Sequence, residues 1–262
     1  MANSYGRLMK KISLFIATSL ISLAAASAAY SEGDQKAPRK LSWSFEGIFG
    51  TVDKQAAQRG FQVYKEVCSA CHSLNRIAFR NLTEIGFSEE EVKALAASYQ
   101  VTDGPNDNGD MFQRPGKPSD YFVPPYANAK AASAIHHGAV PPDLSLIIKA
   151  RHDAPNYIHS LLTGYSPAPA DVQLGEGQYY NPYFPSGKLN MPPPLSEGSV
   201  TYTDGTPATV DQMASDVVNF LQWAAEPEME ARKQMGLKVL IFLAVFTGFM
   251  IVAKRNIWKR IH

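Results

Sequence analysis

Cysteine is scarce in this chain, which has two cysteines among its 262 residues. A scaffold held by several disulfide bonds is therefore excluded, and so is a structural zinc site of four thiolates. The sequence also has no internal repeat, so a solenoid or a propeller is not expected. Apolar residues make up 45% of the chain, which is ample for a packed core.

The two cysteines belong to the run Cys68-Ser69-Ala70-Cys71-His72. Cys-x-x-Cys-His is the attachment signature of a c-type haem, in which each thiol adds to one vinyl group and the imidazole binds the iron. A thioredoxin-like motif needs a βαβ context, and a zinc site needs two further ligands; neither is evident here. The sequence predicts one haem c, covalently attached through two thioethers, with His72 as a metal ligand. No disulfide bond is then available.

The second axial ligand is not fixed by the motif. An electron carrier fills both axial positions of its iron, and a methionine thioether raises the reduction potential. Met191 precedes three prolines, which fix φ and stiffen the loop that would hold its sulfur. Met111 is a second candidate, whereas Met213 falls on the apolar face of an expected helix and is more simply a core residue. Four histidines are rivals: His136, His137, His152 and His159.

Two apolar runs indicate export and membrane attachment. A basic start, an apolar run over 12–26 and the small residues Ala26-Ser27-Ala28 predict a cleaved signal peptide over residues 1–28, with an uncleaved anchor as the alternative. The run 235–253 holds one charge, Lys238, and as a helix it spans about 28 Å, close to the thickness of the bilayer core. We expect a transmembrane helix there, because a buried globular helix would not be apolar on all faces. The basic tail, residues 254–262, is expected in the cytoplasm.

Charge is spread unevenly along the chain. Arg7, Lys10 and Lys11 give the first part +3, and the segment from Glu230 onward has seven basic residues and one acidic residue, which is +6. Since the whole chain carries +1, residues 30–229 carry −8. An acidic redox domain attracts a basic partner over long range, although ordinary solubility explains the same charge. No nucleic-acid partner is expected.

Helical periodicity and capping residues predict a mainly α fold. Asp53 is a plausible N-cap, Ser88 to Glu91 form a capping box, and glycines end several segments. Residues 103–118 and 167–197 are rich in turn formers and are expected to be irregular. The predicted fold is a cytochrome c-like haem domain over residues 29–230, with long loop insertions and one C-terminal transmembrane helix. The expected helices are 54–67, 88–99, 128–137, 143–151, 156–163 and 210–225.

Several stretches together resemble one family. They are RGFQVYKEVCSACHSL, DGPNDNGDMFQRPGKPSDYF, GAVPPDLSLIIKARH, SLLTGY and NPYFPSGKLNMPPPL, and they occur in the family's order over nearly the whole mature chain. The chain resembles the cytochrome c1 family, bacterial type, the membrane-anchored haem subunit of the cytochrome bc1 (quinol–cytochrome c oxidoreductase) complex. The resemblance implies that Met191 is the axial methionine, that Arg151 lies by a haem propionate, that Tyr157 and Phe184 lie near the haem, and that Pro142 packs on the porphyrin.

The resemblance also implies a role. The haem would take electrons from the Rieske iron–sulfur protein and pass them to a soluble or tethered c-type cytochrome, with cytochrome b as a further partner. The chain would not be an enzyme on its own. It would sit in the cell inner membrane in a single pass, with the haem domain on the periplasmic side. Expected docking charges for a basic acceptor are Glu84, Glu89, Glu90, Glu91, Asp103, Asp107 and Asp110.

One departure and one alternative stand beside this reading. The family often has Asn-Asn where this chain has His136-His137, so a family hydrogen bond from that position to a propionate is in doubt. An imidazole there adds pH sensitivity. The alternative function is another membrane-anchored c-type cytochrome that donates to a terminal oxidase; the PPDLS and NPYF stretches argue against it.

Overall fold

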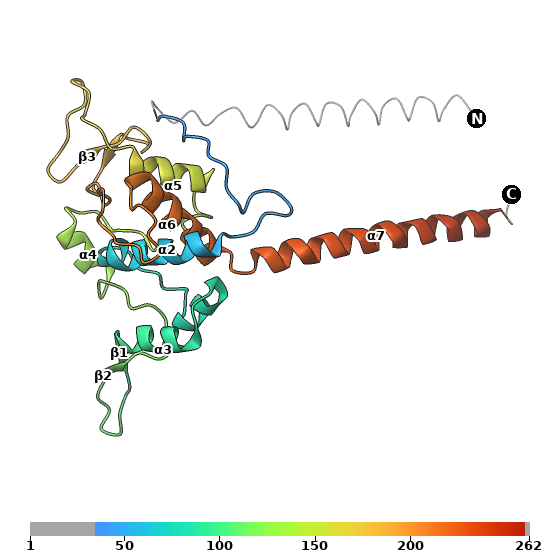
Figure 1. Cartoon of the computed structure of the whole chain (residues 1–262), viewed down its shortest axis with the longest axis horizontal. Coiled ribbons are helices and arrows are strands. Elements are labelled where there is room, and N and C mark those ends of the chain that lie inside the picture. Colours follow the sequence, from blue (N-terminus) through green and yellow to red (C-terminus); the bar gives the residue numbers. More distant parts are fainter. Residues whose placement is uncertain (1–34, 260–262) are drawn as a thin grey trace, which may run out of the picture.

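The computed structural model describes residues 35–259 and is mainly helical, as expected (Figure 1). The signal peptide predicted for residues 1–28 lies outside the described residues, as do the last three residues of the tail. The elements are α2 (Lys54–Glu66), η2 (Cys68–Ala70), η3 (Phe79–Ile85), α3 (Glu89–Ala97), β1 (Gln100–Asp103), β2 (Phe112–Pro115), α4 (Ala129–Ile135), α5 (Ala154–Thr163), β3 (Tyr179–Tyr180), β4 (Lys188–Leu189), α6 (Val210–Ala225) and α7 (Met229–Trp258).

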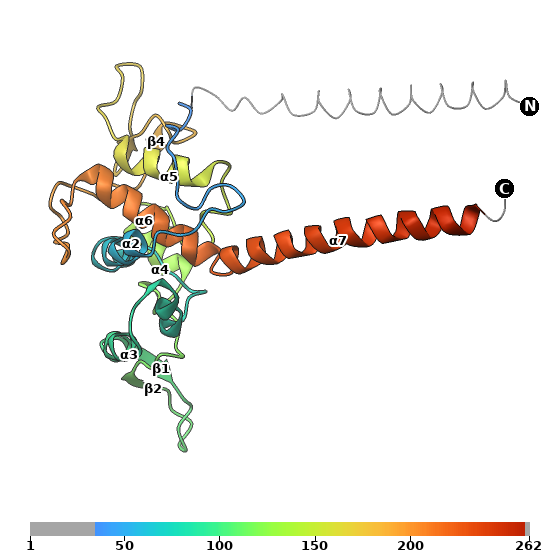
Figure 2. The same ribbon diagram turned by 45° about the vertical axis from the view of Figure 1, so that its right-hand side comes forward.

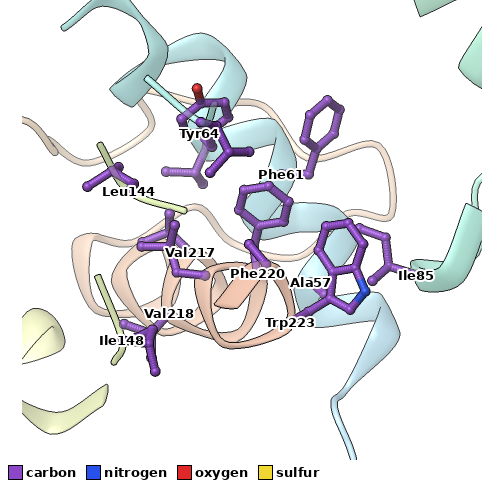
Figure 3. Packing of buried hydrophobic residues seen from close by; sticks show 14 of the residues in the cluster. Ala57, Phe61, Tyr64, Ile85, Leu144, Ile148, Val217, Val218, Phe220 and Trp223 are labelled. Carbon is purple, nitrogen blue, oxygen red and sulfur yellow. The ribbon is translucent and has the colours of Figure 1, made fainter. Parts of the chain in front are cut away.

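Helices α2 and α6 cross at the centre of the core. Gly60 permits their close approach, because a Cβ at this position would lie 2.0 Å from the carbonyl oxygen of Asp216. Aromatic rings fill the space beside the crossing, and Figure 3 shows Phe61, Tyr64 and Phe220 gathered there. The ring centroids of Phe61 and Phe220 are 5.6 Å apart, a spacing at which aromatic pairs attract beyond simple burial. The end of α2, where the haem motif begins, is thus fixed by the core.

A buried ion pair joins the same two helices. The Asp216 side chain is 1% exposed, and its carboxylate accepts hydrogen bonds from Arg59 Nε at 3.0 Å and Arg59 Nη2 at 2.9 Å. Arg59 Nη1 also donates to Asp204 at 3.0 Å. The hydrogen bond to Asp216 is the main cause that raises the pKa of Arg59 above its ordinary value, against the effect of burial. A buried carboxylate needs such a partner.

Capping residues set several of the helix starts. Asp53 accepts a hydrogen bond from Ala56 N, as predicted, and Thr209, which was not predicted as a cap, accepts one from Gln212 N. Ser88 and Glu91 form the predicted reciprocal capping box at the start of α3. The helices expected over 54–67, 88–99, 128–137, 156–163 and 210–225 are confirmed to within a few residues. N-cap side chains act locally, which is why the sequence reveals them.

The expectation of irregular chain over residues 103–118 is wrong in part. Strands β1 and β2 pair antiparallel, with Gln100 opposite Pro115 and Asp103 opposite Phe112. Arg114 holds the hairpin: its guanidinium contacts Asp103 across the pair and lies 2.6 Å from Asp120 Oδ2. The side chains of β1 and β2 are mostly exposed, so their burial does not stabilise the hairpin. The two carboxylates bound to the Arg114 guanidinium stabilise it instead.

The helix expected over 143–151 is also wrong, because residues 144–150 form successive turns. Asp143 does receive a hydrogen bond from Ser145 N at 2.9 Å, as a helix cap would. However, its carboxylate is also bound by residues 73–75, and Ser145 Oγ accepts from Arg76 N at 3.1 Å. The segment is therefore tied to the chain that follows the haem motif, and it does not continue as a helix.

The long loop region expected over 167–197 is confirmed, apart from the two-residue strands β3 and β4. The C-terminal helix α7 projects from the rest of the described chain (Figures 1 and 2). An 18-residue window of α7 has a mean hydropathy of 2.3, and none of that window is buried. α7 is long and apolar enough to cross a membrane, and it extends beyond the expected run 235–253 at both ends.

Candidate haem site

Both cysteines lie in one tight turn at the end of α2. Cys71 N donates to Cys68 O at 3.1 Å, and His72 N donates to the same oxygen at 2.9 Å. The thiols are half-buried and do not form a disulfide bond with each other. Burial, and then the neighbouring Cys71, raises the pKa of the Cys68 thiol to about 12. The turn therefore presents two thiols and an imidazole from positions 68, 71 and 72.

The His72 ring is oriented by a backbone oxygen. His72 Nδ1 lies 2.8 Å from the carbonyl oxygen of Pro142, so Nδ1 carries the proton and donates. Burial lowers the pKa of His72, and the hydrogen bond to Pro142 opposes this only in part. The other nitrogen, Nε2, is then left with its lone pair for a metal. A histidine ligand usually has its second nitrogen fixed in this way.

Asp143 brings Pro142 to this position. Its carboxylate accepts hydrogen bonds from Ser73 Oγ at 2.8 Å and from Asn75 N at 2.8 Å, while Leu144 N donates to Ser73 O at 2.9 Å. Burial alone would raise the pKa of Asp143, but these hydrogen bonds outweigh it and the net shift is downward. Residues 142–144 are thus clamped onto residues 72–75, directly after the motif.

Met191 is half-buried and lies in the stiff Asn190-Met191-Pro192 stretch. Its carbonyl oxygen accepts a hydrogen bond from the Tyr165 hydroxyl at 3.0 Å, which ties the methionine segment to the chain just after α5. Gly164 allows this path, because a Cβ there would lie 2.4 Å from Tyr183 Cδ2. No hydrogen bond among the described residues joins Met191 to His72.

The other residues implied by the resemblance fall in two places. Arg151 is exposed, with its Nη1 donating to Ala150 O at 3.0 Å, and its charge acts on the hydroxyl of Tyr157, which is buried. Burial raises the pKa of Tyr157, and Arg151 lowers it in part. Phe184 is half-buried in the turn before β4, where its N–H donates to Asn181 O at 3.0 Å. The structure brings Pro142 to His72 and Arg151 to Tyr157, and leaves Phe184 in a separate turn.

The rival ligands occupy different surroundings. His159 is fully buried, with its ring 6.1 Å from that of Trp43, and Met213 is also fully buried, as expected of a core residue. Met111 is 61% exposed beside the β1–β2 hairpin, and His152 is exposed. A sulfur exposed to this degree is not held as a ligand must be.

Two tyrosines were missed by sequence reasoning. The Tyr165 hydroxyl donates to the carbonyl oxygen of Met191. The sequence signal that could have identified Tyr165 is its position directly after SLLTG. The Tyr126 hydroxyl lies 2.7 Å from His136 Nε2 and 3.4 Å from Ala70 O, inside the haem motif. His137, the second residue of the pair, has φ of 49° and packs against Gly177. The two histidines therefore contact different segments.

The expected docking charges divide into two groups. Glu84 accepts from Trp223 Nε1 at 3.2 Å, Glu91 caps α3, and Asp103 contacts Arg114. The remaining side chains are exposed and make no hydrogen bond or ion pair with another described residue: Glu89, Glu90, Asp107 and Asp110. Four charges are thus available to a partner without breaking a contact within the fold.

The residues present fit a covalently attached porphyrin. Two thiols and an imidazole with an available Nε2 come from one turn, and a thioether comes from a stiff loop. Residues 135–146 and 174–179 come together where a Cβ at Gly177 would lie 2.6 Å from the His137 ring. Both segments carry exposed apolar side chains, which are Ile135, Val140, Leu146, Leu174 and Tyr179. These donors are those of a haem c site.

Comparison with known proteins agrees with this chemistry. The model of the Cytochrome C1 family matches residues 43–261. Cytochrome c1 of Rhodospirillum rubrum is 53% identical over 236 residues, which cover 84% of this chain and 87% of the relative. Cytochrome b/c1 of Bradyrhizobium diazoefficiens is 49% identical over 253 residues, covering 88% of this chain and 37% of that protein. The cytochrome b-c1 complex catalytic subunit, mitochondrial, of Candida albicans is 51% identical over 225 residues, covering 86% and 78%. The chain belongs to the cytochrome c1 family.

Proposed function

We propose that this chain is the electron-transfer subunit of a respiratory or photosynthetic cytochrome bc1 complex. It carries one haem c on Cys68 and Cys71, with His72 and Met191 as the axial ligands. When bound, the haem supplies a single iron that accepts one electron from the reduced Rieske iron–sulfur protein and gives it to a c-type cytochrome. If His72 and Met191 both held the iron, no position on it would be left for a substrate, and the chain would not be an enzyme on its own.

Residues of the chain set the reduction potential of the haem, the positions of its ligands and the docking of the acceptor. Pro142 O holds the His72 ring through Nδ1, so that Nε2 keeps a fixed direction. Tyr165 holds the Met191 backbone, and a thioether ligand favours the ferrous state and raises the potential. Arg151 is the cation for a propionate, with Tyr157 beside it. Pro142 and Phe184 supply apolar contact. The four unpaired acidic side chains attract a basic acceptor.

The single observation that carries this proposal is the His72–Pro142 hydrogen bond of 2.8 Å directly after Cys-x-x-Cys, in a chain of this family. A structural zinc site would need further thiolate or imidazole ligands beside the two thiols and this imidazole, and a thioredoxin-like Cys-x-x-Cys would need a βαβ context. Among the described residues no group of three His, Cys, Asp or Glu side chains is placed to hold a metal ion. This favours the assignment of the two thiols and the imidazole to one haem over their assignment to a zinc site.

The proposed location rests on the segments at the two ends of the chain, and the proposed partners rest on the family to which the chain belongs. Residues 1–28 form a cleaved signal peptide, residues 29–230 form the periplasmic haem domain, residues 235–253 of α7 cross the inner membrane once, and residues 254–262 face the cytoplasm. Cytochrome b and the Rieske protein are the neighbouring subunits. The name of the Bradyrhizobium relative, cytochrome b/c1, supports the first of these partners.

Purification from membranes tests the proposal. We expect a c-type spectrum that resists extraction by acidified acetone, with the near-infrared band of sulfur ligation. We also expect copurification with b-type haem and a two-iron–two-sulfur cluster, and reduction of this haem by quinol only when that cluster is present. A colourless chain would overturn the haem assignment. Copurification with a terminal oxidase and without the cluster would instead support the other class of membrane-anchored cytochrome.

A further inference from the structure

Two exposed apolar side chains lie at the tip of the turn formed by residues 43–51. Ile48 is 72% exposed and Phe49 is 76% exposed, which makes them the two most exposed large apolar side chains in the described part of the chain. Single exposed apolar residues are ordinary on protein surfaces. An adjacent pair at the tip of a turn is a more specific feature, because both side chains point away from any core.

The fold builds this tip rather than leaving it loose. Trp43 and Phe45 at its base are buried, and their rings stack with centroids 5.5 Å apart. Thr51 N donates to Ser44 O at 3.0 Å and closes the turn. Gly47 has φ of +71°, in the left-handed region that favours glycine. A Cβ at Gly50 would lie 2.0 Å from Glu46 O. The backbone therefore projects Ile48 and Phe49 outward.

The tip is fixed to the first turns of α7. Lys233 Nζ donates to Phe45 O at 2.7 Å and to Gly50 O at 3.0 Å. Val52 N donates to Glu230 Oε1 at 3.0 Å. Both views show the blue turn beside the point where α7 leaves the rest of the chain (Figures 1 and 2). The tip is thus level with Lys233, just before the apolar stretch that begins at Met235.

We propose that Ile48 and Phe49 insert into the lipid interface of the membrane that α7 spans. The inference rests on the proposed membrane span and adds a second, shallow attachment to it. The base of the turn lies at the end of the span that carries Lys238, a side chain that reaches the headgroup level near a helix end. The tip itself carries one charge, Glu46. An aromatic and an aliphatic side chain at that depth gain from burial at the acyl boundary.

The attachment has a consequence for the haem domain. A single helix fixes the distance of a domain from the bilayer but leaves rotation about the helix axis and tilt free. A second contact beside the helix prevents the domain from tilting in one direction. The haem domain then meets its membrane-bound electron donor in one orientation.

The scarcity of cysteine makes the test direct. With Cys68 and Cys71 consumed by the haem, Phe49→Cys introduces the single reactive thiol of the mature chain. A nitroxide at this position, in the full chain reconstituted into phosphatidylcholine vesicles, reports collision with membrane-soluble oxygen and with a water-soluble nickel chelate. Phe112→Cys is the matched control, since Phe112 is an exposed phenylalanine on the β1–β2 hairpin. Phe246→Cys, within α7, reports the span itself. Covalent haem absorbance confirms that each variant folds.

We expect oxygen to collide more often than nickel at positions 49 and 246, and the reverse at position 112. Nickel access at 49 with protection at 246 would overturn the inference and leave the anchor intact. Protection at 49 that appears only in the assembled complex would also overturn it, because a partner subunit would then cover the tip. Nickel access at 246 would overturn the anchor, and with it the proposed topology.

Discussion

His72 and Pro142 are 70 positions apart, yet the Nδ1 of the first lies 2.8 Å from the carbonyl oxygen of the second. The acceptor is a backbone atom, so no side-chain substitution removes it directly. Its position depends instead on Asp143, which is bound to Ser73 and Asn75. The proximal side of the proposed haem is therefore determined by a contact between two segments that the sequence separates.

Replacement of Met191 by leucine tests the second ligand. We expect Met191→Leu to keep the covalent haem, because the thioethers are untouched, and to lose the near-infrared band. The potential should fall by on the order of 0.1 V or more, within the range of about 0.8 V that axial ligation covers, and turnover should stop. Met213→Leu, in the core, is the control for a general packing effect. A redox titration in which Met191→Leu keeps the original potential would exclude this ligand.

Arg59→Ala tests the ion pair between α2 and α6. It leaves the Asp216 carboxylate, 1% exposed, without its guanidinium. Loss of one partner of a buried pair costs about 3–5 kcal/mol, so we expect the free energy of unfolding to fall by about that amount in a urea titration of the full chain in detergent. Arg80→Ala, at an exposed arginine, should change it by less than about 0.5 kcal/mol. Equal effects of the two substitutions would argue against the pair.

The hairpin β1–β2 should lose protection in acid. Arg114 holds the pKa of Asp120 down to about 2, against about 3.9 in an unfolded chain. A lowered carboxyl pKa contributes stability that is fully present above the unfolded value and is lost as the pH falls through the folded value. The protection factors for hydrogen exchange over residues 100–115, which correct for the intrinsic pH dependence of exchange, should therefore be steady above about pH 4 and fall below it, before those in α6 do. Asp120→Asn should exchange fast throughout; if it shows the same acid transition, another group is responsible.

The exposed acidic side chains predict salt-dependent electron transfer. Attraction between exposed charges is screened within about 10 Å at 0.1 M salt. We expect the rate of electron transfer to a basic c-type cytochrome to fall as salt rises, and the slope to shrink when Glu89, Glu90, Asp107 and Asp110 are all converted to amides. Glu46→Gln, on the α7 side, is the control and should leave the slope unchanged. If the rate in the unsubstituted chain did not change with salt, docking by these four acidic side chains would be ruled out.

Local signals carried most of the fold prediction. The cap at Asp53, the capping box from Ser88 and the apolar face of 210–225 each depend on residues within one or two turns, so the sequence reveals them without knowledge of the fold. The two errors concern side-chain contacts that capping and periodicity patterns do not show. Asp143 looks like a helix N-cap, but residues 73–75 bind its carboxylate. Arg114 stabilises a hairpin by binding Asp120, which lies outside either strand.

The candidate site divides in the same way. Cys68, Cys71 and His72 are read from one run of five residues, because the chemistry itself requires that spacing. The contacts from Pro142, Tyr126 and Tyr165 act through a carbonyl oxygen or a hydroxyl, and they reach His72, Ala70 and Met191 only when distant segments fold together. Every residue has a carbonyl oxygen, so the type of a residue does not show whether its backbone accepts such a hydrogen bond.

The clamp of residues 142–144 onto residues 72–75 has a kinetic consequence. Electron exchange is slowed by every atom that must move when the charge on a centre changes. The His72 ring is held through Nδ1 by a backbone oxygen in a segment that three hydrogen bonds fix. For the proposed haem, a ring held in this way would limit the movement of this ligand when the iron gains or loses an electron.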